Sequence, residues 1–484
     1  MGRIRLLAWS GLLLITAAAL GHNLPRLSPG MLDWAEPGNV AAALVQGRGF
    51  SDPFDGGTGA TAWVSPLPVW VESLAFLAFG VKSAAAAKAL LVLSVVGLSA
   101  ANALILSALE PFGAWAGTAA SAAFLAACAF VPAGPLQVLS EAWLDVLLSS
   151  VLLWAALEVS RSPGGRGATA LVAASFLAPL ENAGLAVSVG LVVLALGWRL
   201  RQRPGALRLP LAAASAAALA VAAWSARNAV AFGRFVPLKS NSWFELNLAN
   251  VDSADGLPRM ESVLRRLPYF DQGQFALYSA LGETRYVDLF RAPALAALRA
   301  DPLHFAANVM RRAEDAAVFC RREGGGAFTR APLRPEDAAR LSLAGELIGA
   351  GRTGAFWTRI DAPPDRERAL FHGLHLSDED GAWRDWAEKR LDYDAQFRGF
   401  GGIACGYLTA GFPVAALLVC ALLCGGRLPS PAAWAAGIGF GMLLPYVLVN
   451  HNERHQLPLF AMQAVAVGCC VQAIAGRQEK PKRT

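Results

Sequence analysis

The chain has 484 residues, of which 55% are apolar and only 16% are charged. Soluble domains carry about 25% charged residues, so this composition excludes a soluble enzyme, a disordered tail and a fibrous protein. Apolar runs recur along most of the chain, which excludes a single-pass receptor and indicates an all-α polytopic membrane protein. The net charge is +6. The positions of the basic residues along the chain are more informative than this total, because basic residues orient membrane helices. Nucleic acid is not expected as a partner.

Residues 6–24 form the first apolar run. The following Leu24-Pro25-Arg26 lacks the small residues of a signal-peptide cleavage site, so we expect a retained first helix with its N-terminus in the cytoplasm. A polar connection over 25–66 follows, and residues 39–46 within it predict a short helix at the membrane interface. The seven cysteines lie mostly in apolar runs without CxxC pairing, which is typical of small core residues rather than disulfides.

The remaining apolar runs predict a bundle of about 10 membrane helices. They cover 67–81, 84–109, 113–133, 139–160, 168–199, 208–226, 402–425, 431–449 and 456–475. We therefore expect an N-terminal membrane module over 1–226 and a mainly helical outer domain over 227–401. Residues 402–484 add C-terminal membrane helices and a basic cytoplasmic tail. No internal repeat is visible, which disfavours a transporter built from symmetric halves.

Two topologies compete for the N-terminal module. If 67–81 spans the membrane, Lys82, Lys88 and Glu141 fall on the cytoplasmic side. If 67–81 lies at the interface, 168–199 must be a hairpin of two helices that turns at Pro179–Asn182. The second arrangement places most basic connections in the cytoplasm, as the positive-inside rule requires, and puts Glu181 at a polar tip, so we favour it. Both arrangements place 25–66, 227–401 and 450–455 outside and the C-terminus inside.

The first outer connection carries two carboxylates, Asp33 and Glu36, three residues apart. On a helical turn they would share one face, where a carboxylate can act as a general base on an acceptor hydroxyl or amine. The alternative is a helix N-cap at Asp33 and a solvated Glu36.

The residues around this pair resemble a known family. Asp33 is followed by Ala41-x-x-Leu44-x-x-Gly47-x-Gly49-Phe50 and then Thr58-Gly59-Ala60-Thr61-Ala62-Trp63. This pattern is similar to the first periplasmic loop of bacterial polyprenyl-phosphate-sugar glycosyltransferases of the GT-C superfamily, near glycosyltransferase family 39. That group includes the protein O-mannosyltransferases and the lipid A aminoarabinose transferase.

Three further stretches resemble the same family in the same order. They begin at Trp224-x-x-Arg227-Asn228, at Leu281-Gly282-Glu283-x-x-Tyr286 and at Asn452-Glu453-Arg454-His455. The family often has Asp-Glu in the first loop, and here Trp34 replaces the Glu, whereas some relatives carry a Glu at the position of Glu36. The resemblance implies a GT-C-like transmembrane bundle, with Asp33 as the acceptor-activating carboxylate and Glu36 as its rival or helper.

The resemblance also implies a donor site. Glu141, in Ser140-Glu141, resembles an acid at the second outer loop, although a helix-start acid is the simpler explanation. Cations must hold the donor phosphate as the sugar leaves. The candidates are Arg454, His455, Lys82, Lys88 and Arg227; Arg454 is also explained as an interface anchor. Trp63 can stack on a sugar, and Asn241 and Glu245 are further substrate-binding candidates.

No soluble cofactor is expected. His372-x-x-His375 has ligand spacing but no cysteine or carboxylate site beside it, and metal dependence is left open. Neither a Walker A motif nor a Gly-rich Rossmann loop is present. The resemblance implies an inner-membrane glycosyltransferase that passes a sugar from a polyprenyl-phosphate carrier to an extracytoplasmic glycan, lipid or protein, with inversion. The alternatives are a polyprenyl-lipid flippase or transporter, which requires paired charges at mid-bilayer, and a non-catalytic protein of the same fold.

Overall fold

The computed structural model describes most of the chain outside 318–416. The described residues are 10–19, 34, 36–130, 141–203, 205–252, 256, 266–268, 271–317, 417, 420–422, 424, 428–449 and 459–478. Within them the secondary structure is helical, apart from an isolated antiparallel bridge between Ser51 and Ala60. Asp33, Arg454, His455, residues 318–401 of the predicted outer domain and most of the run 402–425 lie outside the described residues.

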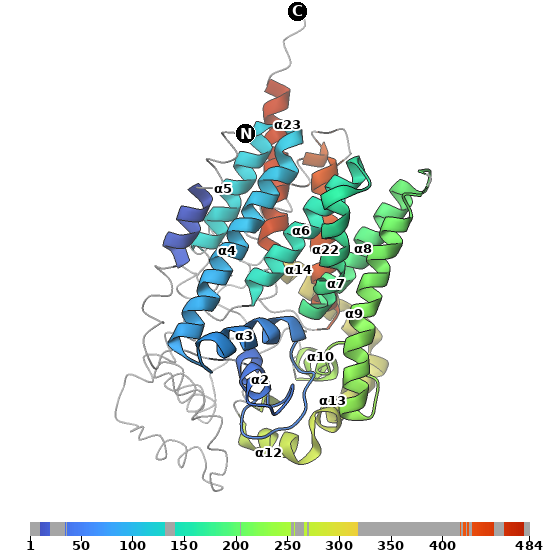
Figure 1. Ribbon diagram of the computed structural model, residues 1–484. Helices are drawn as coiled ribbons and strands as arrows, with labels where there is room; N and C mark the ends of the chain where they lie inside the picture. Colours follow the sequence, from blue (N-terminus) through green and yellow to red (C-terminus); the bar gives the residue numbers. More distant parts are fainter. Residues whose placement is uncertain are drawn as a thin grey trace, which may run out of the picture.

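Long apolar helices form an upright bundle (Figure 1). They are α4 (Ala84–Leu109), α5 (Ala114–Phe130), α6 (Ala142–Arg161), α7 (Gly165–Glu181), α8 (Ala183–Leu200), α9 (Arg208–Phe232), α22 (Ser430–Leu448) and α23 (Phe460–Gln478). Five described helices, α4 with its 3-10 extension, α6, α8, α9 and α22, are long and apolar enough to cross a membrane. The all-α, multi-pass class expected from the apolar runs is confirmed.

The bundle packs closely because small residues let the helix backbones approach. At Gly184 on α8 and Gly441 on α22 an added Cβ would collide with the facing helix, at Met442 and Ser188 respectively. The hydroxyl of Ser188 also donates a 2.8 Å hydrogen bond to the carbonyl of Ile438. Helices α8 and α22 are thereby joined although 250 residues separate them.

The predicted hairpin over 168–199 is confirmed. Helix α7 ends at Glu181, Asn182 turns the chain and caps α8 by accepting a 2.7 Å hydrogen bond from Gly184 N. Helix α9 runs on to Phe232, so the membrane helix extends six residues past the boundary expected at 226.

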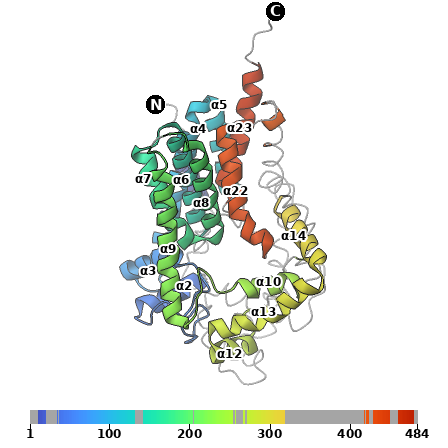
Figure 2. The same ribbon diagram turned by 90° about the vertical axis from the view of Figure 1, so that its right-hand side faces the viewer.

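Shorter helices lie at the end of the bundle away from the C-terminus (Figures 1 and 2). They are α2 (Glu36–Val45), α3 (Pro66–Phe79), α10 (Ser242–Asn250), α12 (Gln272–Leu281), α13 (Glu283–Ala300) and α14 (Pro302–Ala317). We call them the outer helices. They have a core of their own, dominated by aromatic rings such as Phe54, Trp63, Phe244, Tyr278 and Tyr286.

Helix α3 lies across the end of the bundle in Figure 1, rather than along its axis. Its 14 residues extend only about 21 Å at 1.5 Å per residue, which is shorter than the roughly 30 Å hydrocarbon core of a bilayer. It packs against α2, α4 and α7. This placement agrees with the second topology, in which 67–81 lies at the interface.

Candidate functional site

Helices α2 and α3 bring two acids to the bundle end. Glu36 is the first residue of α2, and Glu72 lies in the middle of α3 with only 8% of its surface exposed. The helices touch at Gly38, where an added Cβ would lie 3.1 Å from Oε2 of Glu72. Trp34 closes the contact by packing edge-on against Phe76 of α3, with ring centroids 4.8 Å apart.

Helices α6 and α7 contribute three more acids at the same end. Glu141 is the exposed residue that precedes α6, and Asp145 is buried one turn further in. Glu181, the last residue of α7, is buried as well. Asn182 donates a 3.3 Å hydrogen bond to Oδ2 of Asp145 and accepts a 2.9 Å hydrogen bond from the hydroxyl of Tyr446 on α22.

These side chains interact electrostatically. The charge of Glu141 repels the carboxylates of Glu72, Asp145 and Glu181, and the charge of Lys239 attracts those of Asp145 and Glu181. Burial raises the pKa of Glu72 well above its ordinary value, Glu141 raises it further and Lys82 lowers it. We call Glu72, Glu141, Asp145 and Glu181 the acid cluster.

Three oxygens of the acid cluster are buried without a hydrogen-bond partner among the described residues: Oε2 of Glu72, Oδ1 of Asp145 and Oε2 of Glu181. A buried, unpaired carboxylate oxygen is costly, so a protein retains such atoms mainly where a ligand or a proton has to be bound. Asp145 and Glu181 lie in the first turn of α6 and the last turn of α7. They are therefore at helix ends rather than mid-bilayer, where a transporter would place its paired charges.

Sequence reasoning missed Glu72 as a site residue and used Glu181 only for topology. The available signal was an acid inside the apolar segment 66–79, because an ionisable residue in such a run is usually functional. The electrostatic attraction of Lys239 to Asp145 and Glu181 also depends on the fold.

The loop between α2 and α3 is bound from two sides. Arg227 on α9 donates hydrogen bonds to the carbonyls of Phe50 and Thr61, at 2.6 and 2.7 Å. Glu283, the first residue of α13, accepts from the hydroxyl of Thr61 and, at 2.6 Å, from the backbone N–H of Ala62. Burial raises the pKa of Glu283, and the Thr61 hydrogen bond is the largest opposing influence. The guanidinium of Arg227, expected at the donor phosphate, thus contacts loop carbonyls.

The other predicted residues lie around this centre. Lys82 donates to Asn39 at 2.7 Å and pairs with Asp55 at 3.4 Å, whereas Lys88 is exposed in the first turn of α4. Trp63 is buried against Phe54, Phe244 and Tyr278. Asn241 precedes α10 and donates to Glu245 at 3.3 Å.

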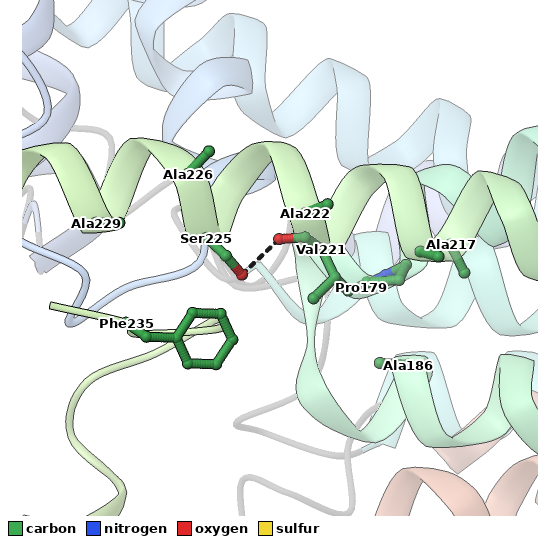
Figure 3. Close-up of a pocket in the computed structure, with 10 residues that line it drawn as sticks. Pro179, Ala186, Ala217, Val221, Ala222, Ser225, Ala226, Ala229 and Phe235 are labelled. Atoms are coloured by element: carbon green, nitrogen blue, oxygen red, sulfur yellow. Dashed lines mark hydrogen bonds between the residues drawn. The ribbon is translucent and has the colours of Figure 1, made fainter.

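An apolar groove of about 650 Å³ lies beside the acid cluster, between α7, α8 and α9. Small residues of α9 form one wall, and Pro179, two residues before Glu181, forms part of the other (Figure 3). The lining residues are Pro179, Ala186, Ala217, Ala218, Val221, Ala222, Ser225, Ala226, Ala229 and Phe235. The groove is open at the side, so an elongated apolar ligand can enter it from between the helices.

Among the described residues, no group of three or more His, Cys, Asp or Glu side chains is arranged to hold a metal ion.

Models of known protein families and curated proteins gave no match to the sequence. Similar solved structures include the following two. The Archaeoglobus fulgidus oligosaccharyltransferase, tethered with an acceptor peptide containing the NVT sequon, is 10% identical with a TM-score of 0.39, over 97% of this chain and 50% of that chain. ArnT from Cupriavidus metallidurans, bound to undecaprenyl phosphate, is 16% identical with a TM-score of 0.34, over 96% of this chain and 77% of that chain.

The chain therefore spans half the length of the oligosaccharyltransferase. Both TM-scores lie below 0.5, so the function is inferred from this chain's own residues.

Proposed function

We propose that this protein is an integral membrane glycosyltransferase of the GT-C type, which transfers a sugar from a polyprenyl-phosphate donor to an extracytoplasmic acceptor. The observation that carries the proposal is the acid cluster, which collects carboxylates from α3, α6 and α7 at the bundle end. An apolar groove is lined by Pro179, two residues before Glu181. An amphiphilic donor needs both features within reach of each other, an apolar seat for its tail and polar groups for its sugar.

The chemistry is a direct displacement with inversion. The acceptor oxygen or nitrogen attacks the anomeric carbon while the bond from that carbon to the phosphate oxygen breaks. The acceptor's proton passes to a loop-one carboxylate, Asp33 or Glu36, acting as general base. The bonding electron pair leaves with the polyprenyl phosphate, whose growing charge requires cations.

Lys239 is our first candidate for the phosphate, since it is exposed and faces the acid cluster. Arg454 and His455 are further candidates from the family resemblance. Arg227 and Lys82 are assigned to holding the first outer loop, because the hydrogen bonds of their cationic groups go to loop residues. Glu72, Asp145 and Glu181 would receive the sugar hydroxyls, which can donate to the unpaired carboxylate oxygens.

The donor's tail would occupy the groove between α8 and α9. Its lining of alanines leaves room for a methyl-branched chain. Phe235 lies at the Ser225 end of the groove (Figure 3), four residues before Lys239. A lipid seated there would present its phosphate near Lys239.

The test is sugar transfer in proteoliposomes with a panel of polyprenyl-phosphate sugars and a cell-envelope extract as acceptor. Wild type would be compared with Asp33→Asn, Glu36→Gln and Lys239→Ala, and with Glu110→Gln, an exposed acid beyond the far end of α4. We expect consumption of one donor by wild type and Glu110→Gln, and loss of it in Asp33→Asn or Glu36→Gln. Movement of a labelled polyprenyl lipid without consumption of any donor would replace the enzyme by a flippase.

A further inference from the structure

Thr61 is held between two charged side chains from distant parts of the chain, the half-buried Arg227 and the buried Glu283. Its carbonyl accepts from the guanidinium of Arg227 on α9, at 2.7 Å, and its hydroxyl donates to the carboxylate of Glu283 on α13. Thr61 is fully buried, and Glu283 is 2% exposed. Arg227 and Glu283 also attract each other electrostatically. We call Thr61, Arg227 and Glu283 the loop junction.

The loop junction joins the two ends of the segment 50–61 in the first outer loop. The second guanidinium nitrogen of Arg227 donates to the carbonyl of Phe50 at 2.6 Å, and Thr61 N donates to the same carbonyl at 3.1 Å. Phe50 lies five residues after α2 ends, and Thr61 lies five residues before α3 begins. One arginine therefore fixes the spacing between the two helices that carry Glu36 and Glu72.

The carboxylate of Glu283 accepts three hydrogen bonds. Besides the Thr61 hydroxyl, its carboxylate accepts from the backbone N–H of Ala62 at 2.6 Å and from the hydroxyl of Tyr278 at 2.7 Å. Three donors that converge on one buried carboxylate define its position closely, because each lost hydrogen bond would leave a buried polar group unpaired.

The loop junction is also connected to the segment that carries Lys239. The carbonyl of Ala62 accepts a 3.0 Å hydrogen bond from the backbone N–H of Ser240, the residue after Lys239. Residues 61–62 thus connect the loop that carries the acids of α2 and α3 to the segment that carries Lys239.

We propose that Glu283 is a positioning residue for the sugar transfer: through Thr61 and Ala62 it sets α2, which begins with Glu36, and Lys239 at their working separation. This inference rests on the proposed function and adds a residue of α13 that touches neither donor nor acceptor. It assigns the outer helices α12 and α13 the task of shaping the catalytic end of the bundle.

Two variant pairs test the proposal. Glu283→Ala removes the carboxylate, and Glu283→Gln keeps its shape but not its charge. Thr61→Val removes the hydroxyl that Glu283 accepts from, and Thr61→Ser retains it, so the serine variant is the conservative control. All four would be reconstituted as full-length protein.

The first readout does not depend on activity. Spin labels at Ala60→Cys and Ala280→Cys, two exposed positions on the loop and on α12, report the loop-to-α12 distance in a background without the seven native cysteines. We expect one narrow distance in wild type and Thr61→Ser, and a broadened distribution in Glu283→Ala and Thr61→Val. An unchanged, narrow distribution in Glu283→Ala would overturn the proposal.

The second readout is steady-state transfer. Misplacement of catalytic groups by about 1 Å can cost roughly a hundredfold in rate. We expect kcat to fall between roughly tenfold and a hundredfold in Glu283→Ala and Thr61→Val, with KM for the donor changed less and Thr61→Ser near wild type. A full kcat in variants whose distance distribution is broad would also overturn the positioning role. If wild type transfers no sugar, the proposed function fails, and the spin-label distances still decide whether Glu283 fixes the loop.

Discussion

Gly38 of α2 and Glu72 of α3 meet with no room for a side chain between them. A Cβ on Gly38 would lie 3.1 Å from Oε2 of Glu72 and 3.0 Å from the Cβ of Trp34. The buried acid of α3 therefore lies directly against the helix that begins with Glu36. The closeness of these two helices brings the predicted general base and a second, buried carboxylate to one place.

Replacing Gly38 by alanine should push α2 away from α3. Overpacking of this kind costs about 1–3 kcal/mol, and we expect both a lower thermal unfolding midpoint and a lower kcat. Gly197→Ala on α8 is the matched control, because an added Cβ there meets nothing within 4 Å and alanine is the better helix former by about 1 kcal/mol. Equal behaviour of the two variants would contradict the close contact at Gly38.

Glu72 should make stability depend on pH. Because burial raises its pKa in the folded protein, the folded state binds the proton more tightly than the unfolded state does. Proton binding to Glu72 therefore adds to the free energy of unfolding. This contribution is fully present below the unfolded pKa of about 4.3 and is lost as the pH rises through the raised folded pKa. It amounts to about 1.4 kcal/mol per unit of difference between the two pKa values. We expect the unfolding midpoint of wild type to fall with rising pH relative to Glu72→Gln. Parallel pH curves for the two proteins would show that Glu72 is not buried.

Filling the apolar groove should weaken binding of a long-chain donor. Ala222 and its neighbour Ala223 are both exposed, but only Ala222 lines the groove. We expect Ala222→Phe to raise KM for a long polyprenyl donor by roughly tenfold, equivalent to about 1.4 kcal/mol, with less effect on a short-chain analogue. Ala223→Phe should leave both values near wild type. An equal rise in KM for both chain lengths would place the tail elsewhere.

Arg312 on α14 should stabilise the end of α22. It is fully buried and donates to the carbonyls of Val447 and Leu448, at 2.6 and 3.2 Å, and of Gly256 at 2.9 Å. An unsatisfied buried carbonyl costs about 1–3 kcal/mol. Since lysine cannot reproduce the planar fork of donors, we expect Arg312→Lys to lower the unfolding midpoint markedly.

The neighbouring Arg311 provides the control for that experiment. It is exposed, and the hydrogen bond that it donates to Asn308 is long, at 3.3 Å. We expect Arg311→Lys to unfold near the wild-type temperature. A comparable loss in both variants would indicate a general need for arginine on α14 rather than a specific contact with α22.

The sequence by itself determined where the helices lie. The run 84–109 became α4 with the same bounds, and the break at Pro179–Asn182 became the hairpin between α7 and α8. Such features follow from local composition, because an apolar run long enough to span a bilayer and an internal proline or polar cap act within a few residues of themselves.

Only the tertiary structure decided which charged residues share a site. Thr61 and Glu283 are 222 residues apart in the chain, and no local pattern connects them. Glu72 looked like one acid in an apolar segment until α3 was placed across the bundle end, against α2, α4 and α7. Arg227 is expected at a phosphate from its sequence motif, but its neighbours are the carbonyls of Phe50 and Thr61. The partners of a buried charge are set by how helices pack, and that packing depends on contacts between residues far apart in the sequence.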